Sequence, residues 1–173
     1  MTQMEMETDL ERIRELARRR DDENWTFRSF LKGCDDKEID GLVHEILEEV
    51  TAAVDCTQCA NCCISLGACV NQDDIKRLSK ALGMSAQAFE TQFVKEDDVG
   101  PILGGKPCPF LKENRCSVYQ HRPSDCADYP NLHKDGFVFR LMSVVNNCAV
   151  CPIVFNVYER LKDAMDFRRR GLR

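Results

Sequence analysis

The sequence predicts a mainly α-helical fold with a small β-hairpin and short strands, a compact but irregular domain held together by metal. Apolar residues recur at helical spacing on both sides of the middle of the chain. The middle itself is rich in cysteine, and the whole chain has eleven cysteines in 173 residues. Thiolates are soft ligands for zinc, iron and iron–sulfur clusters, so this density indicates metal ligation rather than packing.

We expect residues 1–33 to form an N-terminal helical arm and residues 34–173 to form a cysteine-cluster metal-binding domain. Within residues 6–20, acidic residues come early and arginines late, as the helix dipole favours. The apolar face is narrow, which fits a loosely docked arm or a helix that binds a protein partner: Leu10, Ile13 and Leu16. Three aromatic residues follow in a segment without a clear element, and we expect them to cover the core: Trp25, Phe27 and Phe30.

The clearest predicted helix follows Asp35, which can cap it, with Glu38 three residues further on. A wide apolar stripe then continues toward Cys56: Ile39, Leu42, Val43, Ile46, Leu47, Val50 and Val54. His44 lies off this stripe, and we expect a surface histidine rather than a ligand. The helix is expected to deliver the first cysteines.

Two shorter helices are predicted next, capped by Asn71 and Ser85, with Gly83 at the turn between them. We expect this helical hairpin to cover the metal core. Later elements are a loop, a hairpin turning at 112–115, a strand after Asp135-Gly136, and a last helix beginning at Pro152. Their ranges are 99–105 for the loop, 108–119 for the hairpin and 137–145 for the strand.

Composition narrows the classes of function. The net charge is −5, whereas nucleic-acid binding favours a basic face, so the basic end at 168–173 is interpreted as a solvated helix end. The sequence has neither a signal peptide nor a run of roughly 18 apolar residues, so we expect a cytoplasmic protein outside the membrane. In that reducing compartment, an odd number of cysteines favours metal ligation over disulfides.

The run Cys56-x-x-Cys59-x-x-Cys62-Cys63 places four thiols within eight residues. Further candidate ligands lie along the chain: Cys108, Cys116, Cys126, Cys148 and Cys151. Adjacent side chains diverge, so Cys62 and Cys63 leave open one cluster or two separate metals. Cys69 also remains open, whereas Cys34 is interpreted as a small buried residue.

Three details favour an iron–sulfur cluster over zinc, which remains the alternative. Proline follows Cys108 and Cys151, as in ferredoxin-type runs. The ligands are gathered from across the chain, and apolar residues that can shield a cluster lie beside them: Phe110, Leu111, Tyr119 and Tyr129. Backbone N–H groups and the cations Arg115 and Arg122 are candidates to offset the negative charge of the thiolates.

The ordered set of motifs between Cys56 and Cys151 resembles the YkgJ-type cysteine-cluster proteins. Its parts are the Cys56–Cys63 run, Cys108-Pro-Phe-Leu, Cys116-x-Val-Tyr-x-x-Arg-Pro-x-x-Cys126, and Tyr129-Pro130. The resemblance implies chelation of zinc or iron by Cys56, Cys59, Cys62, Cys63, Cys108, Cys116 and Cys126, with Cys148 as an eighth ligand. Two positions depart from the family pattern: Ala60, where glycine is common, and Ala127, where arginine is common.

The sequence therefore predicts a metal-binding protein whose site is structural or serves electron transfer or sensing. A metal-dependent enzyme is the first alternative, with acids and bases near Cys126: His121, Asp125, Asp128 and His133. Some relatives are associated with flagellin lysine methylation, but the chain has no glycine-rich cofactor loop. A metal-stapled interaction module, with the N-terminal helices binding a partner, is the second alternative.

Overall fold

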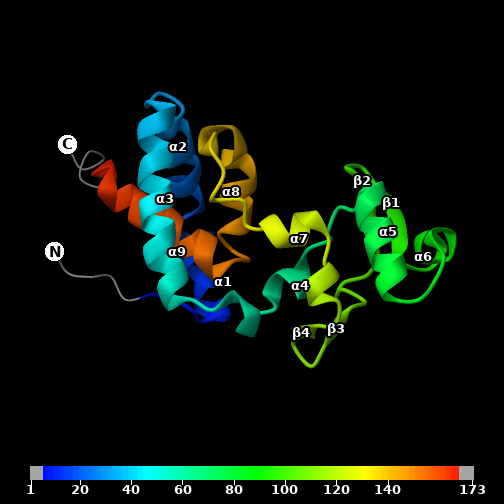
Figure 1. Ribbon diagram of the computed structural model, residues 1–173. Coiled ribbons are helices and arrows are strands. Elements are labelled where there is room, and N and C mark those ends of the chain that lie inside the picture. The colour runs from blue at the N-terminus through cyan, green and yellow to red at the C-terminus, as the bar shows by residue number, and fades with distance from the viewer. Residues whose placement is uncertain (1–5, 168–173) are drawn as a thin grey trace. The chain divides into compact units, whose positions relative to one another are not determined.

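The structure is a computed structural model that describes residues 6–167 (Figure 1). Its contacts divide the chain into a first unit, residues 1–55 with 130–173, and a second unit, residues 56–129. Helices predominate, and the strands form two antiparallel pairs, which confirms the predicted fold class. The proposed division at residue 33 stays a prediction, and the basic segment 168–173 lies outside the described residues.

The first unit is built from helices that bury their apolar faces on one another. α3 and α1 pack against α9, while α2 packs against α8. The elements of this unit are α1 (Leu10–Arg19), α2 (Asp21–Leu31), α3 (Asp36–Ala53), η3 (Phe137–Arg140), α8 (Leu141–Asn147) and α9 (Pro152–Ala164). Phe27 and Tyr158 are fully buried, with ring centroids 5.2 Å apart in an edge-on arrangement. The aromatic segment without an assigned element is thus helix α2.

Local capping explains where the predicted helices of this unit begin. The Asp9 side chain accepts from the backbone N–H groups of Glu11 and Arg12, which starts α1 four residues later than the predicted range. Asp35 accepts from the backbone N–H of Glu38 and starts α3 as predicted. Pro152 occupies the first turn of α9, also as predicted.

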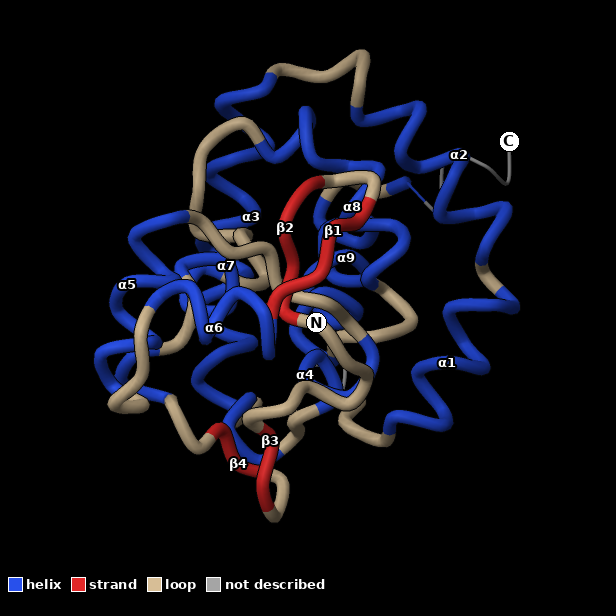
Figure 2. Tube along the Cα trace, turned by 90° about the vertical axis from the view of Figure 1, so that its right-hand side faces the viewer, coloured by secondary structure: helices blue, strands red, loops and turns tan. Residues whose placement is uncertain are grey.

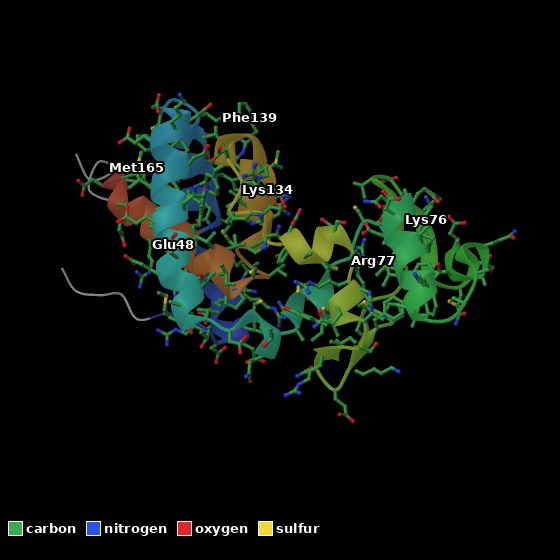
Figure 3. All side chains as sticks on the ribbon, viewed as in Figure 1. Glu48, Lys76, Arg77, Lys134, Phe139 and Met165 are labelled. Carbon is green, nitrogen blue, oxygen red and sulfur yellow. The ribbon has the colours of Figure 1, made fainter. Side chains whose placement is uncertain are left out.

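The predicted strand over residues 137–145 is wrong, because this segment forms η3 and α8. Its buried residues recur at helical spacing: Phe137, Leu141, Val144, Val145 and Cys148. Phe139 is instead 82% exposed (Figure 3). Within residues 6–167 no single helix is long and apolar enough to cross a membrane, although the bent pair Phe137–Asn147 and Pro152–Ala164 meets the length and composition criterion together.

The second unit combines short helices with two hairpins (Figure 2). Its elements are η1 (Cys56–Gln58), α4 (Asn61–Ser65), α5 (Gln72–Ala81), α6 (Ala86–Phe93), β1 (Val94–Asp97), β2 (Gly100–Leu103), β3 (Leu111–Lys112), β4 (Arg115–Cys116), η2 (Tyr119–His121) and α7 (Ser124–Asp128). Asn71 and Ser85 cap α5 and α6 as predicted, and Gly83 adopts a positive φ of 68° between them. The predicted helical hairpin is therefore confirmed.

The predicted loop over residues 99–105 is wrong in part, because β2 pairs with β1 in antiparallel register. β2 contains Pro101, and proline donates no ladder hydrogen bond. A two-stranded hairpin tolerates it, and the Pro101 carbonyl accepts from Val70 N–H at 3.0 Å. The hairpin β3–β4 forms as predicted, with Glu113 and Asn114 at its turn, both in the left-handed region.

A small apolar core holds the second unit together. Phe89 and Phe110 stack with ring centroids 6.2 Å apart, and Phe93 contacts both rings. The core consists of residues from the helical hairpin, β2 and the cysteine-bearing loops: Val70, Ile75, Leu78, Phe89, Leu103, Phe110 and Val118. Cys108 and Cys116 pack against this core. The helical hairpin thus contributes to the core on which these two cysteines pack.

Candidate metal centre

The Cys56–Cys63 run folds into two short helical turns at the start of the second unit. Cys56 begins η1, and its carbonyl accepts from Cys59 N–H at 3.2 Å. Cys62 and Cys63 lie in α4, which follows Ala60. Ala60 has a φ of 51°, in the left-handed region that favours glycine. The left-handed step at Ala60 redirects the chain between Cys59 and Cys62, so one continuous helix does not carry all four thiols.

A backbone hydrogen bond brings the second group of cysteines to the first. Cys108 N–H donates to the carbonyl of Cys63 at 2.7 Å, although 45 positions separate them in the sequence. Cys108 leads into β3, and Cys116 ends β4 opposite Leu111. The short β3–β4 hairpin therefore holds Cys108 and Cys116 on neighbouring chain segments beside α4.

Backbone N–H groups are directed at two of these sulfurs. Burial raises the pKa of Cys108, but hydrogen bonds from the backbone of Phe110 and Leu111 act in the opposite direction. Burial also raises the pKa of Cys116, and a backbone hydrogen bond from Val118 opposes that effect. Donors that favour the charged form of a thiol are what a metal-bound thiolate needs. The backbone around Cys108 and Cys116 thus provides hydrogen bonds that stabilise these two residues as thiolates.

A negative charge on Cys63 acts on three other thiols of this unit. Its charge contributes to raising the pKa of Cys108, Cys116 and Cys126. Burial is the main cause at Cys126, where together with the neighbouring charges it raises the pKa to about 12. At Cys63 itself, the hydrogen bond with Cys62 raises the pKa first, and burial adds to it. Four thiols from four segments therefore interact electrostatically: Cys63, Cys108, Cys116 and Cys126.

The donor set fits a thiophilic metal by its chemistry. Soft thiolates with backbone N–H partners suit zinc, iron and iron–sulfur clusters alike. Among the residues described, however, no group of three or more Cys, His, Asp or Glu side chains is arranged so that it could hold an ion as it stands. Tetrahedral ligation at about 2.3 Å requires sulfurs roughly 3.8 Å apart. Ligation therefore needs these sulfurs to come closer together.

Of the two predicted cations, Arg122 lies near the thiols. Its charge lowers the pKa of Cys116 against the dominant effect of burial. Its guanidinium carbon lies 3.9 Å from the ring centroid of Tyr119 and a guanidinium nitrogen donates to the Tyr119 carbonyl at 2.9 Å. Of the residues expected to shield the centre from water, Phe110 is buried, whereas Tyr119 is 44% exposed. Tyr119 therefore contributes mainly by its contact with Arg122. Arg115 is exposed on the β3–β4 hairpin.

The remaining sulfur ligand candidates have other surroundings. Cys148 and Cys151 belong to the first unit, where they are buried at the end of α8 and the start of α9. Burial raises the pKa of Cys148. That these two cysteines bind a metal stays a prediction. Cys69 is exposed, and Cys34 is half-buried with its thiol 3.5 Å from the carbonyl of Phe30.

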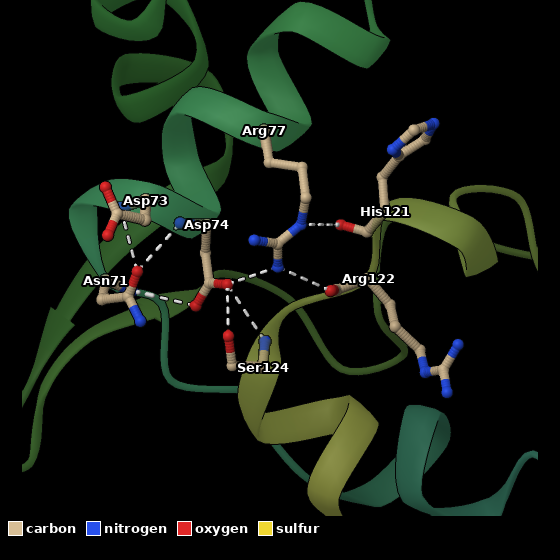
Figure 4. A network of polar contacts seen from close by, with 7 residues as sticks. All are labelled: Asn71, Asp73, Asp74, Arg77, His121, Arg122 and Ser124. Atoms are coloured by element: carbon tan, nitrogen blue, oxygen red, sulfur yellow. Dashed lines mark hydrogen bonds and ion pairs between the residues drawn. The ribbon is translucent and has the colours of Figure 1, made fainter.

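Two of the predicted acid–base residues, His121 and Asp125, form hydrogen bonds that involve the backbone. Asp125 Oδ2 accepts from Cys69 N–H at 3.0 Å, and the His121 carbonyl accepts from Arg77. In the first unit, His44 Nε2 lies 3.9 Å from Asp135 Oδ1. Sequence reasoning missed two further residues that contact the segment 121–124, the buried Asp74 and its partner Arg77 (Figure 4). The only sign of Asp74 in the sequence was its position three residues after Asn71, which is typical of a helix capping box.

Comparison with known proteins matches residues 55–152, more than half of the chain, to one family model. The family is described as "CxxCxxCC: Putative zinc- or iron-chelating domain". No curated protein and no solved structure was found to match the chain. The matched range includes the candidate thiols of both units and excludes α1, α2 and α3.

Proposed function

Because the chain belongs to the CxxCxxCC family of zinc- or iron-chelating domains, we propose that it holds iron or zinc through a thiolate centre in its second unit. The observation that carries the proposal is the backbone hydrogen bond from Cys108 N–H to the Cys63 carbonyl at 2.7 Å, which brings two cysteine-bearing segments together. The proposed ligands are Cys63, Cys108, Cys116 and Cys126. Cys56, Cys59 and Cys62 belong to the same unit and are proposed as supporting or alternative ligands.

We favour iron in an iron–sulfur cluster over zinc. Support comes from the proline after Cys108 and from the apolar core behind Cys108 and Cys116. Four thiolates around either centre leave about two negative charges. The N–H groups of Phe110, Leu111 and Val118, with the guanidinium of Arg122, are the groups of this unit that offset that charge.

The proposal is tested by replacing Cys63 in protein purified without oxygen. Removing an outer hydrogen-bond partner of a metal ligand lowers metal affinity by up to about 100-fold. Cys63→Ser removes a proposed ligand itself, so we expect it to lower metal affinity by more than that. The matched control is Cys34→Ser in the first unit, for which we expect unchanged metal content. Metal analysis and competition with a chelator measure both variants. Wild-type metal content and affinity in Cys63→Ser would overturn the proposal.

A further inference from the structure

A buried carboxylate links helix α5 to the segment that carries Cys126. Asp74 is 1% exposed, and its Oδ2 accepts from the backbone N–H of Asn71 at 3.2 Å, as the α5 capping box requires. Its other oxygen, Oδ1, accepts from Ser124 N–H at 3.0 Å and from Ser124 Oγ at 2.8 Å (Figure 4). Arg77 donates to the same oxygen at 2.5 Å. The carboxylate thus does more than cap its own helix.

The Asp74 carboxylate is held in its charged form. Burial disfavours that form, but hydrogen bonds from Ser124, Asn71 and Arg77 hold the pKa of Asp74 below its ordinary value. A buried charge is costly unless its hydrogen-bonding positions are filled. Replacement of this carboxylate by a neutral side chain therefore removes the charge that Arg77 pairs with and weakens the hydrogen bonds from Ser124.

Arg77 fixes the same segment from the other side. Projecting from α5, it donates to the carbonyls of His121 at 3.4 Å and Arg122 at 2.9 Å (Figure 4). These carbonyls immediately precede Pro123, whose side chain has no oxygen with which to cap α7. α7 has five residues, too short to hold its own conformation. The pair Asp74–Arg77 is thus a long-range anchor for residues 121–124.

The anchored segment carries two groups of the proposed metal centre. Cys126 lies two residues after Ser124, inside α7. Arg122 lies two residues before Ser124, and its charge lowers the pKa of Cys116. A shift of this segment therefore moves one sulfur ligand and one charge-balancing guanidinium together.

We propose that Asp74, with Arg77, is a positioning residue of the metal centre that holds Cys126 and Arg122 against the other thiols. This inference rests on the proposed thiolate centre. Hydrogen-bond partners that orient a metal ligand typically contribute about 10- to 100-fold in metal affinity. Asp74 acts through Ser124 rather than on a ligand side chain, so its loss should weaken ligation by Cys126 without removing that thiol.

The test titrates cobalt(II), as a spectroscopic probe of thiolate ligation, into metal-free full-length protein without oxygen. We expect Asp74→Asn to bind cobalt about 10- to 100-fold more weakly than wild type. Its sulfur-to-cobalt charge-transfer absorption should fall below that of wild type, toward that of Cys126→Ser. Asp73→Asn is the matched control, because the Asp73 side chain is 88% exposed and lies next to Asp74. It should keep the wild-type affinity and spectrum.

A double variant separates positioning from general stability. If Asp74 acts through Cys126, Asp74→Asn combined with Cys126→Ser should bind cobalt no more weakly than Cys126→Ser alone. Additive losses, or a wild-type spectrum and affinity in Asp74→Asn, would overturn the inference. Failure of wild type to bind cobalt would instead overturn the proposed function. Should Asp74→Asn not fold, Ser124→Ala and Arg77→Lys remove fewer bonds and should weaken cobalt binding by a smaller factor in the same direction.

Discussion

At the scale of single residues, the left-handed backbone at Ala60 explains a feature that the sequence showed only as a departure from a family pattern. A residue with a Cβ pays a steric cost of about 1–2 kcal/mol in this region, which glycine avoids. Ala60 has a φ of 51° and is 7% exposed. Glycine is therefore the residue that this turn between Cys59 and Cys62 favours, and alanine is the smallest substitute.

We predict that Ala60→Gly keeps wild-type stability or gains up to about 1 kcal/mol, because relief of the strained φ offsets the lost methyl burial. Ala60→Val should lower the free energy of unfolding by about 1–3 kcal/mol, since a β-branched residue is disfavoured at this φ. Chemical denaturation of the metal-free protein measures both changes. Equal stability of the valine and alanine proteins would contradict this explanation.

The same scale shows what residue patterns reveal of the site. The spacing of the thiols identifies them as candidate ligands, since few other roles place four thiols in eight residues. Asp74 carried only a local signal, its place three residues after Asn71. Its bonds to Ser124 join positions 50 residues apart, and such a pairing depends on the packing of α5 that no local pattern encodes.

At the scale of elements, the segment 137–147 shows why an apolar run is ambiguous between strand and helix. Its helical start depends on Asp40, whose carboxylate accepts from the backbone N–H groups of Gly136 and Phe137 at 2.7 and 2.9 Å. Asp40 lies on α3, almost 100 residues earlier. The helices capped by their own neighbours, α3, α5 and α6, were predicted correctly, whereas this tertiary cap was invisible in the sequence.

The helical assignment of this segment predicts opposite effects at two phenylalanines. In a strand Phe137 and Phe139 would share one face, but here Phe137 is fully buried and Phe139 is 82% exposed. We expect Phe137→Ala to lower the free energy of unfolding by about 3–5 kcal/mol. Phe139→Ala should change it by less than about 0.5 kcal/mol. Thermal or chemical unfolding measures the pair, and similar losses at both positions would rule out the helical arrangement.

At the scale of the whole molecule, the contacts divide the chain into a helical unit and a cysteine-rich unit. The first unit surrounds a buried network in which Lys162 donates to Glu23, Asn24 and Glu159. The second has a small apolar core, and its cysteine-bearing loops are short. A small core of this kind gains most from a bound metal, because binding free energy adds directly to folding.

The composition of the chain predicted a metal-stapled helical fold, and the family match supports metal chelation. The sequence could not identify which thiols share a centre, because that depends on the backbone bond between Cys108 and Cys63 and on the anchor at Ser124. Both are contacts between segments distant in the sequence. Spacing thus marks the thiols as candidate ligands, and contacts between distant segments are the basis for proposing which four share a centre.

The most direct test of the thiolate centre is X-ray absorption at the iron and zinc edges of the full-length protein, purified without oxygen. We expect one centre per chain with about four sulfur ligands, near 2.3 Å, and iron–iron scattering if the centre is a cluster. Zinc with four sulfur ligands would keep the thiolate centre and overturn the cluster. The absence of both metals, or ligation mainly by nitrogen and oxygen, would contradict the central claim.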